Sequence, residues 1–135
     1  MRTFYLFEIK KDILKRYKNN YDSLYSILES IYHNKDVILC YEIFNTIVNP
    51  LYRDKISNDI KKKNLCDENY ICYNYTHSIN NYYLDEYSKM IINNTYIKIN
   101  SNKNNPSFLN DISNKKNIFV CDFEHHDYFL LDALH

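Results

Sequence analysis

The chain of 135 residues contains no glycine and no tryptophan, and only two prolines. Glycine is the residue that usually takes positive φ angles and lets the backbone approach a bound phosphate closely. A P-loop, a dinucleotide-binding turn and the nucleophile elbow of α/β-hydrolases therefore cannot be built here in their usual form. Most nucleotide-dependent enzyme functions are excluded with them.

The chain also lacks an excess of charge of either sign, because 17 basic and 17 acidic residues give a formal net charge of zero. Binding to a phosphate backbone needs an excess of Lys and Arg on one face, so the neutral balance argues against direct nucleic-acid binding. Base stacking on some of the 15 tyrosines, as in single-stranded nucleic-acid binding modules, is a third-ranked hypothesis. Core packing explains most of these tyrosines more simply.

Cysteines are few and show no Cys-x-x-Cys pair; they are Cys40, Cys66, Cys72 and Cys121. The apolar run near the start is interrupted at Glu8 and is too short for a signal-peptide core, and no later segment is long enough to span a membrane. We therefore expect a cytoplasmic protein that does not bind membranes, with reduced and mostly buried thiols.

Two short, nearly continuous apolar runs, residues 4–9 and 118–123, are typical of strands buried on both faces. After the first run, apolar residues recur at intervals of three and four and predict up to four helices before residue 64. The third of these helices should begin near Asp36, and Asn49-Pro50 should close it and start the fourth.

A change to a period of two from Asn69 predicts a strand, and residues 88–92 and 95–100 predict a hairpin. Its turn, Asn93-Asn94, should supply the positive φ angles that glycine would otherwise take. A further helix should start at Asn105-Pro106. The sequence thus predicts a single α/β domain over residues 1–135, a mixed sheet of about four or five strands covered by helices. Its order is strand, three or four helices, strand, hairpin, helix, strand.

The opening segment, RTFYLFEIKKDILKRY, also carries a resemblance. The order Tyr-Leu-Phe-x-Ile-Lys-Lys, followed by an apolar residue and a tyrosine one helical turn later, resembles the start of the sporulation inhibitor of replication (SirA) family. The similarity is clearest from Arg2 to about Leu28. It is looser at Asn49-Pro50, in the TYIKIN segment and in the closing FVCDFEHHDYF.

Members of that family bind the N-terminal domain of the bacterial replication initiator DnaA and hold back new rounds of replication. The resemblance therefore implies a bacterial, non-enzymatic interaction domain that needs no cofactor and whose partner is DnaA. We expect it to be monomeric when free.

The resemblance places the partner-binding surface on the first helix. Tyr17 matches the tyrosine of the family, and Ile13 stands where the family presents a large aromatic residue. Lys10 and Arg16 lie beside them, while Leu14 is expected to face the sheet and anchor the helix. Helical spacing alone explains Ile13 and Tyr17 equally well as core residues.

The segment from Cys121 to Asp127 suggests a different function. If it were extended, its ligand-type side chains would alternate between two faces: Cys121, His125 and Asp127 on one, and Asp122, Glu124 and His126 on the other. A small metal-dependent hydrolase that uses Asp122–Asp127 is the alternative hypothesis. A polar loop leaving a strand explains the segment as well, and His33 and His77 stand alone in the sequence. We expect no metal site and no catalytic residue.

Overall fold

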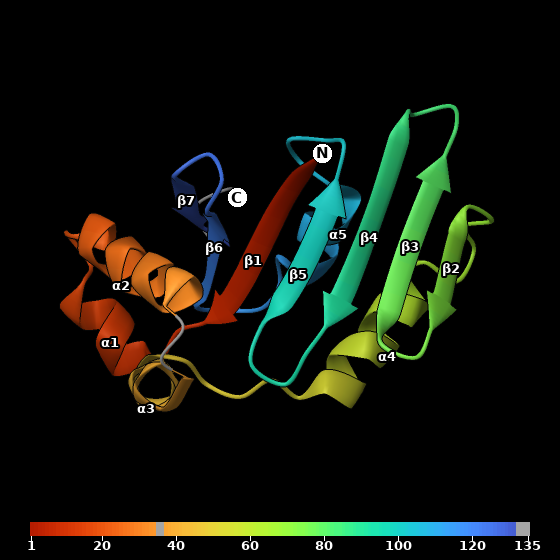
Figure 1. Ribbon diagram of the computed structural model, residues 1–135. Coiled ribbons are helices and arrows are strands. Elements are labelled where there is room, and N and C mark those ends of the chain that lie inside the picture. The colour runs from red at the N-terminus through yellow and green to blue at the C-terminus, as the bar shows by residue number, and fades with distance from the viewer. Residues whose placement is uncertain (35–36, 132–135) are drawn as a thin grey trace.

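The structure is a computed structural model that describes residues 1–34 and 37–131, the side chains of residues 37–40 excepted. It has the mixed α/β composition that the sequence predicts (Figure 1). In chain order the elements are β1 (Arg2–Glu8), α1 (Lys11–Arg16), α2 (Tyr21–His33), α3 (Val37–Ile47), α4 (Arg53–Lys63), β2 (Tyr70–Tyr73), β3 (Thr76–Asn81), β4 (Glu86–Ile92), β5 (Ile97–Ser101), α5 (Ser107–Ile112), β6 (Ile118–Asp122) and β7 (Asp127–Leu130). The predicted start of the third helix near Asp36 lies outside the described residues.

The strands form one seven-stranded sheet in the order β2-β3-β4-β5-β1-β6-β7. Every neighbouring pair is antiparallel. β1 lies between β5 and β6, with Leu6 opposite Ile97 on one side and Val120 on the other. The two continuous apolar runs of the sequence are therefore neighbouring inner strands, which explains why their residues are apolar on both faces.

One face of the sheet is covered by α4 and α5, which lie behind the strands in Figure 1. Alternate residues of each strand point to this face and pack with the apolar stripes of the two helices. The buried residues of this first cluster are Phe4, Leu6, Ile56, Ile60, Ile79, Met90, Ile92, Ile97, Ile99, Phe108, Leu109, Ile112, Ile118, Val120 and Leu131. Burial of so many large side chains is the main source of stability.

The opposite face is covered only in part. There α1, α2 and α3 gather at the end of the sheet formed by β1, β6 and β7 (Figure 1). The buried residues of this second cluster are Phe7, Ile9, Ile13, Leu24, Tyr25, Leu28, Ile47, Val48, Phe119, Cys121 and Phe123. No helix of the described residues covers the same face of β2, β3 and β4.

The predicted sheet is wrong in its strand number and in its direction. The described residues form seven strands instead of the predicted four or five, and the observed sheet is antiparallel throughout instead of mixed. The sequence prediction missed β3 because THSINN is largely polar, with only His77 and Ile79 pointing into the core. It missed β7 because the polar residues before Tyr128 were interpreted as a loop.

The predicted helix start at Asn49-Pro50 is also wrong, because α4 begins at Arg53. Residues 48–51 instead run as an extended connection tied to the sheet. The Asn49 N–H donates to the carbonyl of Glu8 at 2.8 Å, and the Leu51 N–H donates to the carbonyl of Asn94 at 2.7 Å. These backbone hydrogen bonds outweigh the local preference of Asn-Pro for a helix start. At the second such site, α5 begins at Ser107, directly after Pro106.

The predicted hairpin around Asn93-Asn94 is present as β4–β5, but its turn does not use positive φ angles. The four residues 93–96 connect the strands, and loops of this length are usually built around an ordinary type I turn. Positive φ angles occur instead at Asn74, Asp85, Asn117 and His126. Asn and Asp tolerate this conformation better than other residues with a side chain, so they replace glycine in this chain.

We predict opposite effects of two substitutions at Asn117, whose φ is 66°. Asn117→Ala should lower the free energy of unfolding by about 1 kcal/mol because alanine disfavours positive φ, whereas Asn117→Gly should leave it unchanged or raise it slightly. Urea unfolding measures both. Asn114→Ala, an exposed change in the same loop, is the control. Equal losses for the alanine and glycine variants at position 117 would contradict the backbone explanation.

Candidate functional site

The first helix, α1, carries the residues predicted to bind a partner. Lys10 precedes the helix and is half-buried, and its N–H donates to the carbonyl of Ile47 at 2.9 Å. Arg16 is exposed, and Tyr17, at the end of the helix, is half-buried against the second core cluster. The side chains of these three residues are therefore accessible, at least in part, on or beside α1.

Ile13 lies differently from the prediction, since its side chain is only 8% exposed and packs in the second cluster with Ile9. Leu14, expected to anchor the helix, is the less buried of the two. The helix is anchored through Ile13 because the chain turns at Lys10 and brings the side chain of Ile13 to the same face of the sheet as Ile9. In the free chain Ile13 has little surface to offer.

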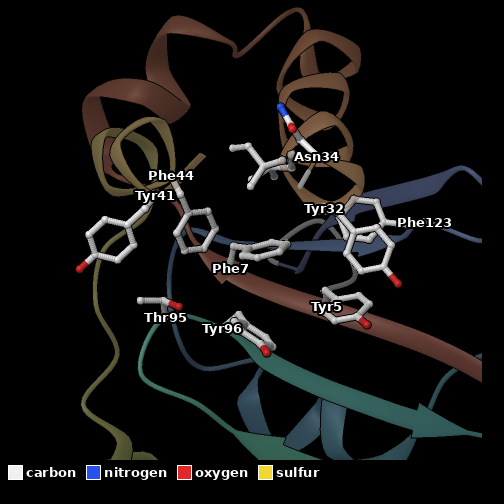
Figure 2. Close-up of a pocket in the computed structure, with 11 residues that line it drawn as sticks. Tyr5, Phe7, Tyr32, Asn34, Tyr41, Phe44, Thr95, Tyr96 and Phe123 are labelled. Carbon is white, nitrogen blue, oxygen red and sulfur yellow. The ribbon is translucent and has the colours of Figure 1, made fainter. Parts of the chain in front are cut away.

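A groove with aromatic walls opens between the last turns of α2, the side of α3 and the sheet (Figure 2). Its volume is about 400 Å³. The described residues that line this aromatic groove are Tyr5, Phe7, Leu28, Ile31, Tyr32, Asn34, Tyr41, Phe44, Thr95, Tyr96 and Phe123. They come from β1, α2, α3, the β4–β5 turn and the β6–β7 turn, so the groove exists only in the folded domain.

The rings of the aromatic groove hold one another in place. Tyr32 stacks on Phe123 with ring centroids 4.6 Å apart, and Tyr5 lies 5.3 Å from Tyr32. Phe44 meets Phe7 edge-on at 5.7 Å. Each such pair adds about 0.5–1.5 kcal/mol beyond simple burial, so the walls are preorganised.

The aromatic groove is suited to apolar contact. None of its described lining residues is an Asp, Glu, His, Cys, Lys or Arg. Its titratable side chains are tyrosines, and burial together with the neighbouring Tyr32 raises the pKa of Tyr5 well above its ordinary value. The lining therefore offers hydroxyls and ring faces, which recognise an apolar or aromatic group.

This groove was not predicted from the sequence, because core packing explains most of the tyrosines there. One signal was available. Tyr5 and Phe7 alternate with Phe4 and Leu6 along β1, so they had to face the layer opposite to α4 and α5.

The segment 121–127 is not extended. The two faces of ligand-type side chains that the sequence suggested required an extended segment, so they do not form. Residues 123–126 form the turn between β6 and β7, with Asp122 paired to Asp127 and a positive φ at His126. Cys121 and Asp122 point to opposite faces of the sheet. The hairpin therefore separates Cys121 from Asp122, and it brings Asp122 together with His125 and Asp127 at Arg2.

Asp122 and Asp127 bind Arg2 instead. The side chain of Asp122 is 1% exposed, and one of its oxygens lies 2.9 Å from Arg2 Nε and 2.9 Å from His125 Nδ1. Burial alone would raise the pKa of Asp122, but the hydrogen bonds from Arg2 and His125 outweigh it and keep the pKa below its ordinary value. Asp127 lies 3.3 Å from Arg2 Nη2. This ion-pair cluster fixes the start of β1 to the β6–β7 hairpin.

Within the described part of the chain, no group of three or more His, Cys, Asp or Glu side chains is arranged to hold a metal ion. The carboxylates of Asp122 and Asp127 contact Arg2.

His77 is isolated in the sequence, but in the folded structure it contacts two polar side chains. It is fully buried between β3 and α4, with Nε2 3.0 Å from Ser57 Oγ and Nδ1 2.6 Å from the Tyr70 hydroxyl oxygen. A neutral imidazole satisfies both contacts when Tyr70 donates to Nδ1 and Nε2–H donates to Ser57. Neither His77 nor Ser57 lines the aromatic groove, so this is a polar network of the core.

The thiols differ in exposure. Cys66 is exposed, Cys72 is half-buried and Cys121 is buried, and all three are free. The side chain of Cys40 lies outside the described residues. The expectation of mostly buried thiols thus holds for Cys121 but not for the other two.

Comparison with known proteins adds no family, because no protein-family model and no curated protein matches the chain. In the described residues no helix is both long and apolar enough to cross a bilayer.

The buried His77 predicts acid sensitivity. Burial lowers its pKa from 6.5 to about 4, so the unfolded chain binds more protons between these values, and stability must fall as the pH drops through them. The loss should be on the order of 2–3 kcal/mol. Urea unfolding across this pH range measures it, and His77→Gln, which cannot take up a proton, should give a flatter curve. Parallel curves would show that other groups cause the acid sensitivity.

The thiols predict an order of alkylation. In the native protein Cys66 should react first, and Cys121 should react only after unfolding, because burial also raises the pKa of its thiol. After denaturation without reductant, mass spectrometry should find all four cysteines labelled. An intact disulfide would contradict the prediction of a reduced, cytoplasmic protein.

Proposed function

We propose that this chain is a non-enzymatic interaction domain of the bacterial cytoplasm that binds the N-terminal domain of the replication initiator DnaA and inhibits new rounds of replication. The partner comes from the resemblance of residues 2–28 to the SirA family. The observation that carries the binding function is the α1 surface, where Arg16 is exposed and Tyr17 keeps part of its ring accessible. The aromatic groove is a second, preorganised apolar surface of the same domain.

The surface of α1 supports a role in docking. Lys11, Lys15 and Arg16 are exposed on this two-turn helix, and Tyr17 follows them with part of its ring accessible. Tyrosine and arginine are the residues that most often dominate protein interfaces. Because the whole chain is electrically neutral, this basic helix is a local feature that can orient an acidic partner and speed its association.

The burial of Ile13 changes the proposed binding surface. Tyr17 is the aromatic anchor, Arg16 and Lys10 flank it, and Ile13 supports the helix from below. The absence of an outward aromatic residue at position 13 leaves Tyr17 with the largest share of the contact.

The test is binding of the purified chain to the isolated DnaA N-terminal domain by calorimetry. Tyr17→Ala should weaken binding by about 30-fold, which corresponds to about 2 kcal/mol. Arg16→Glu should slow association and weaken binding, with little effect on stability because Arg16 is exposed. Tyr17→Ala should also cost about 1–2 kcal/mol of stability, because its ring is half-buried.

Two matched controls lie outside α1. Tyr83→Ala removes the same ring from an exposed hairpin tip, and Lys62→Glu makes a comparable charge reversal on α4. Both should bind normally. If the native chain does not bind the DnaA domain, the proposed partner is wrong. If folded Tyr17→Ala and Arg16→Glu proteins bind normally, the α1 surface is wrong.

A further inference from the structure

The strand β2 forms one edge of the sheet, and in the described residues it pairs only with β3 (Figure 1). Exposed edges normally carry a charge, a proline or a bulge that prevents pairing with another strand. The sequence of β2, YICY, contains no charged residue and no proline, and its register with β3 is regular. This edge is therefore open to a further strand.

The backbone of β2 shows which groups are available. The Asn80 N–H donates to the carbonyl of Asn69 at 3.1 Å, so these two residues form a hydrogen-bonded pair. Such pairs alternate along an antiparallel ladder, so Ile71 and Tyr73 also bond to β3. The N–H and C=O of Cys72 consequently point away from β3 to the open edge.

The side chains of β2 are apolar where they are most exposed. Ile71 is 64% exposed and Tyr73 is 78% exposed, and both lie on the sheet face that no described helix covers. The opposite edge differs, because β7 begins with Asp127, which pairs with Arg2, and its Tyr128 stacks on Tyr25 of α2. Among the described residues, the edge without a charged side chain is therefore that of β2.

We propose that two copies of this chain associate through antiparallel pairing of their β2 strands about a two-fold axis at Cys72. Cys72 of each copy would exchange both N–H···O hydrogen bonds with Cys72 of the other. In this register Ile71 of each copy lies opposite Tyr73 of the other copy, so the pair occurs twice. Aromatic–β-branched pairs are favourable across strands. The sheet becomes continuous through both copies.

A second copy is the partner that fits this edge best. At a two-fold axis a residue of one copy meets the same residue of the other copy. The N–H of each Cys72 can then donate to the C=O of the other Cys72. The strand has no charge that would repel its copy, and the chain as a whole has a formal net charge of zero. This inference departs from the sequence-based expectation of a monomer, and it does not depend on the proposed DnaA partner.

Sedimentation equilibrium of the full chain over a wide concentration range tests the association. The native chain should show a reversible monomer–dimer equilibrium. The double variants Ile71→Lys/Tyr73→Lys and Ile71→Glu/Tyr73→Glu place like charges opposite each other and should each raise the dissociation constant at least tenfold. An equimolar mixture of the two variants should regain dimer as a heterodimer. Tyr82→Lys/Leu84→Lys, on the exposed β3–β4 turn, should dimerise normally.

Hydrogen exchange on the native chain gives an independent readout. The Cys72 amide should become protected as the concentration rises, whereas the Ile71 amide, already bonded to β3, should change little. A native chain that stays monomeric at all concentrations overturns the proposal. So does a dimer that survives the charged variants, a mixture that fails to associate, or a Cys72 amide whose exchange is independent of concentration.

Discussion

The fold depends on the pairing of β1 with two partners from the far part of the chain. β1 takes β5 on one side and β6 on the other, and its alternating side chains enter both core clusters. Phe4 and Leu6 pack under α4 and α5, while Phe7 and Ile9 pack under α1, α2 and α3. The Arg2–Asp122 ion pair then fixes the start of the strand. β1 therefore packs against both layers of helices and joins β5 to β6 in the sheet.

The two faces of the sheet are covered unequally, and the candidate surfaces follow from this difference. α4 and α5 close one face, but α1, α2 and α3 reach only the end with β1, β6 and β7. The aromatic groove lies at the border of that incomplete cover, where rings from helices and strands meet. An open sheet face next to a preorganised groove suits a domain whose function is contact with other proteins.

The spacing of apolar residues predicted the elements whose conformation follows from their own local sequence. The inner strands β1 and β6, the helices of the first half and the β4–β5 hairpin follow from apolar spacing, because burial rewards that spacing wherever the elements pack. β3 did not follow, since only His77 and Ile79 of its six residues are buried and its strand conformation depends on neighbours. The aromatic groove and the Ser57–His77–Tyr70 network were missed because both join residues from separate elements. Local spacing also could not decide between Ile13 and Leu14, since either can face the sheet in a helix of six residues.

The Arg2–Asp122 contact has a consequence for how the chain reaches this structure. Its two residues are 120 positions apart, and β1 must also wait for β5 and β6 before its backbone is paired. Folds dominated by such distant pairings form slowly, because a large loop must close before its contacts stabilise it. During synthesis β1 leaves the ribosome before β5 and β6, and it stays unpaired until these strands follow. During this time its aromatic run is exposed and prone to aggregation, so chaperone binding to this segment would favour correct folding.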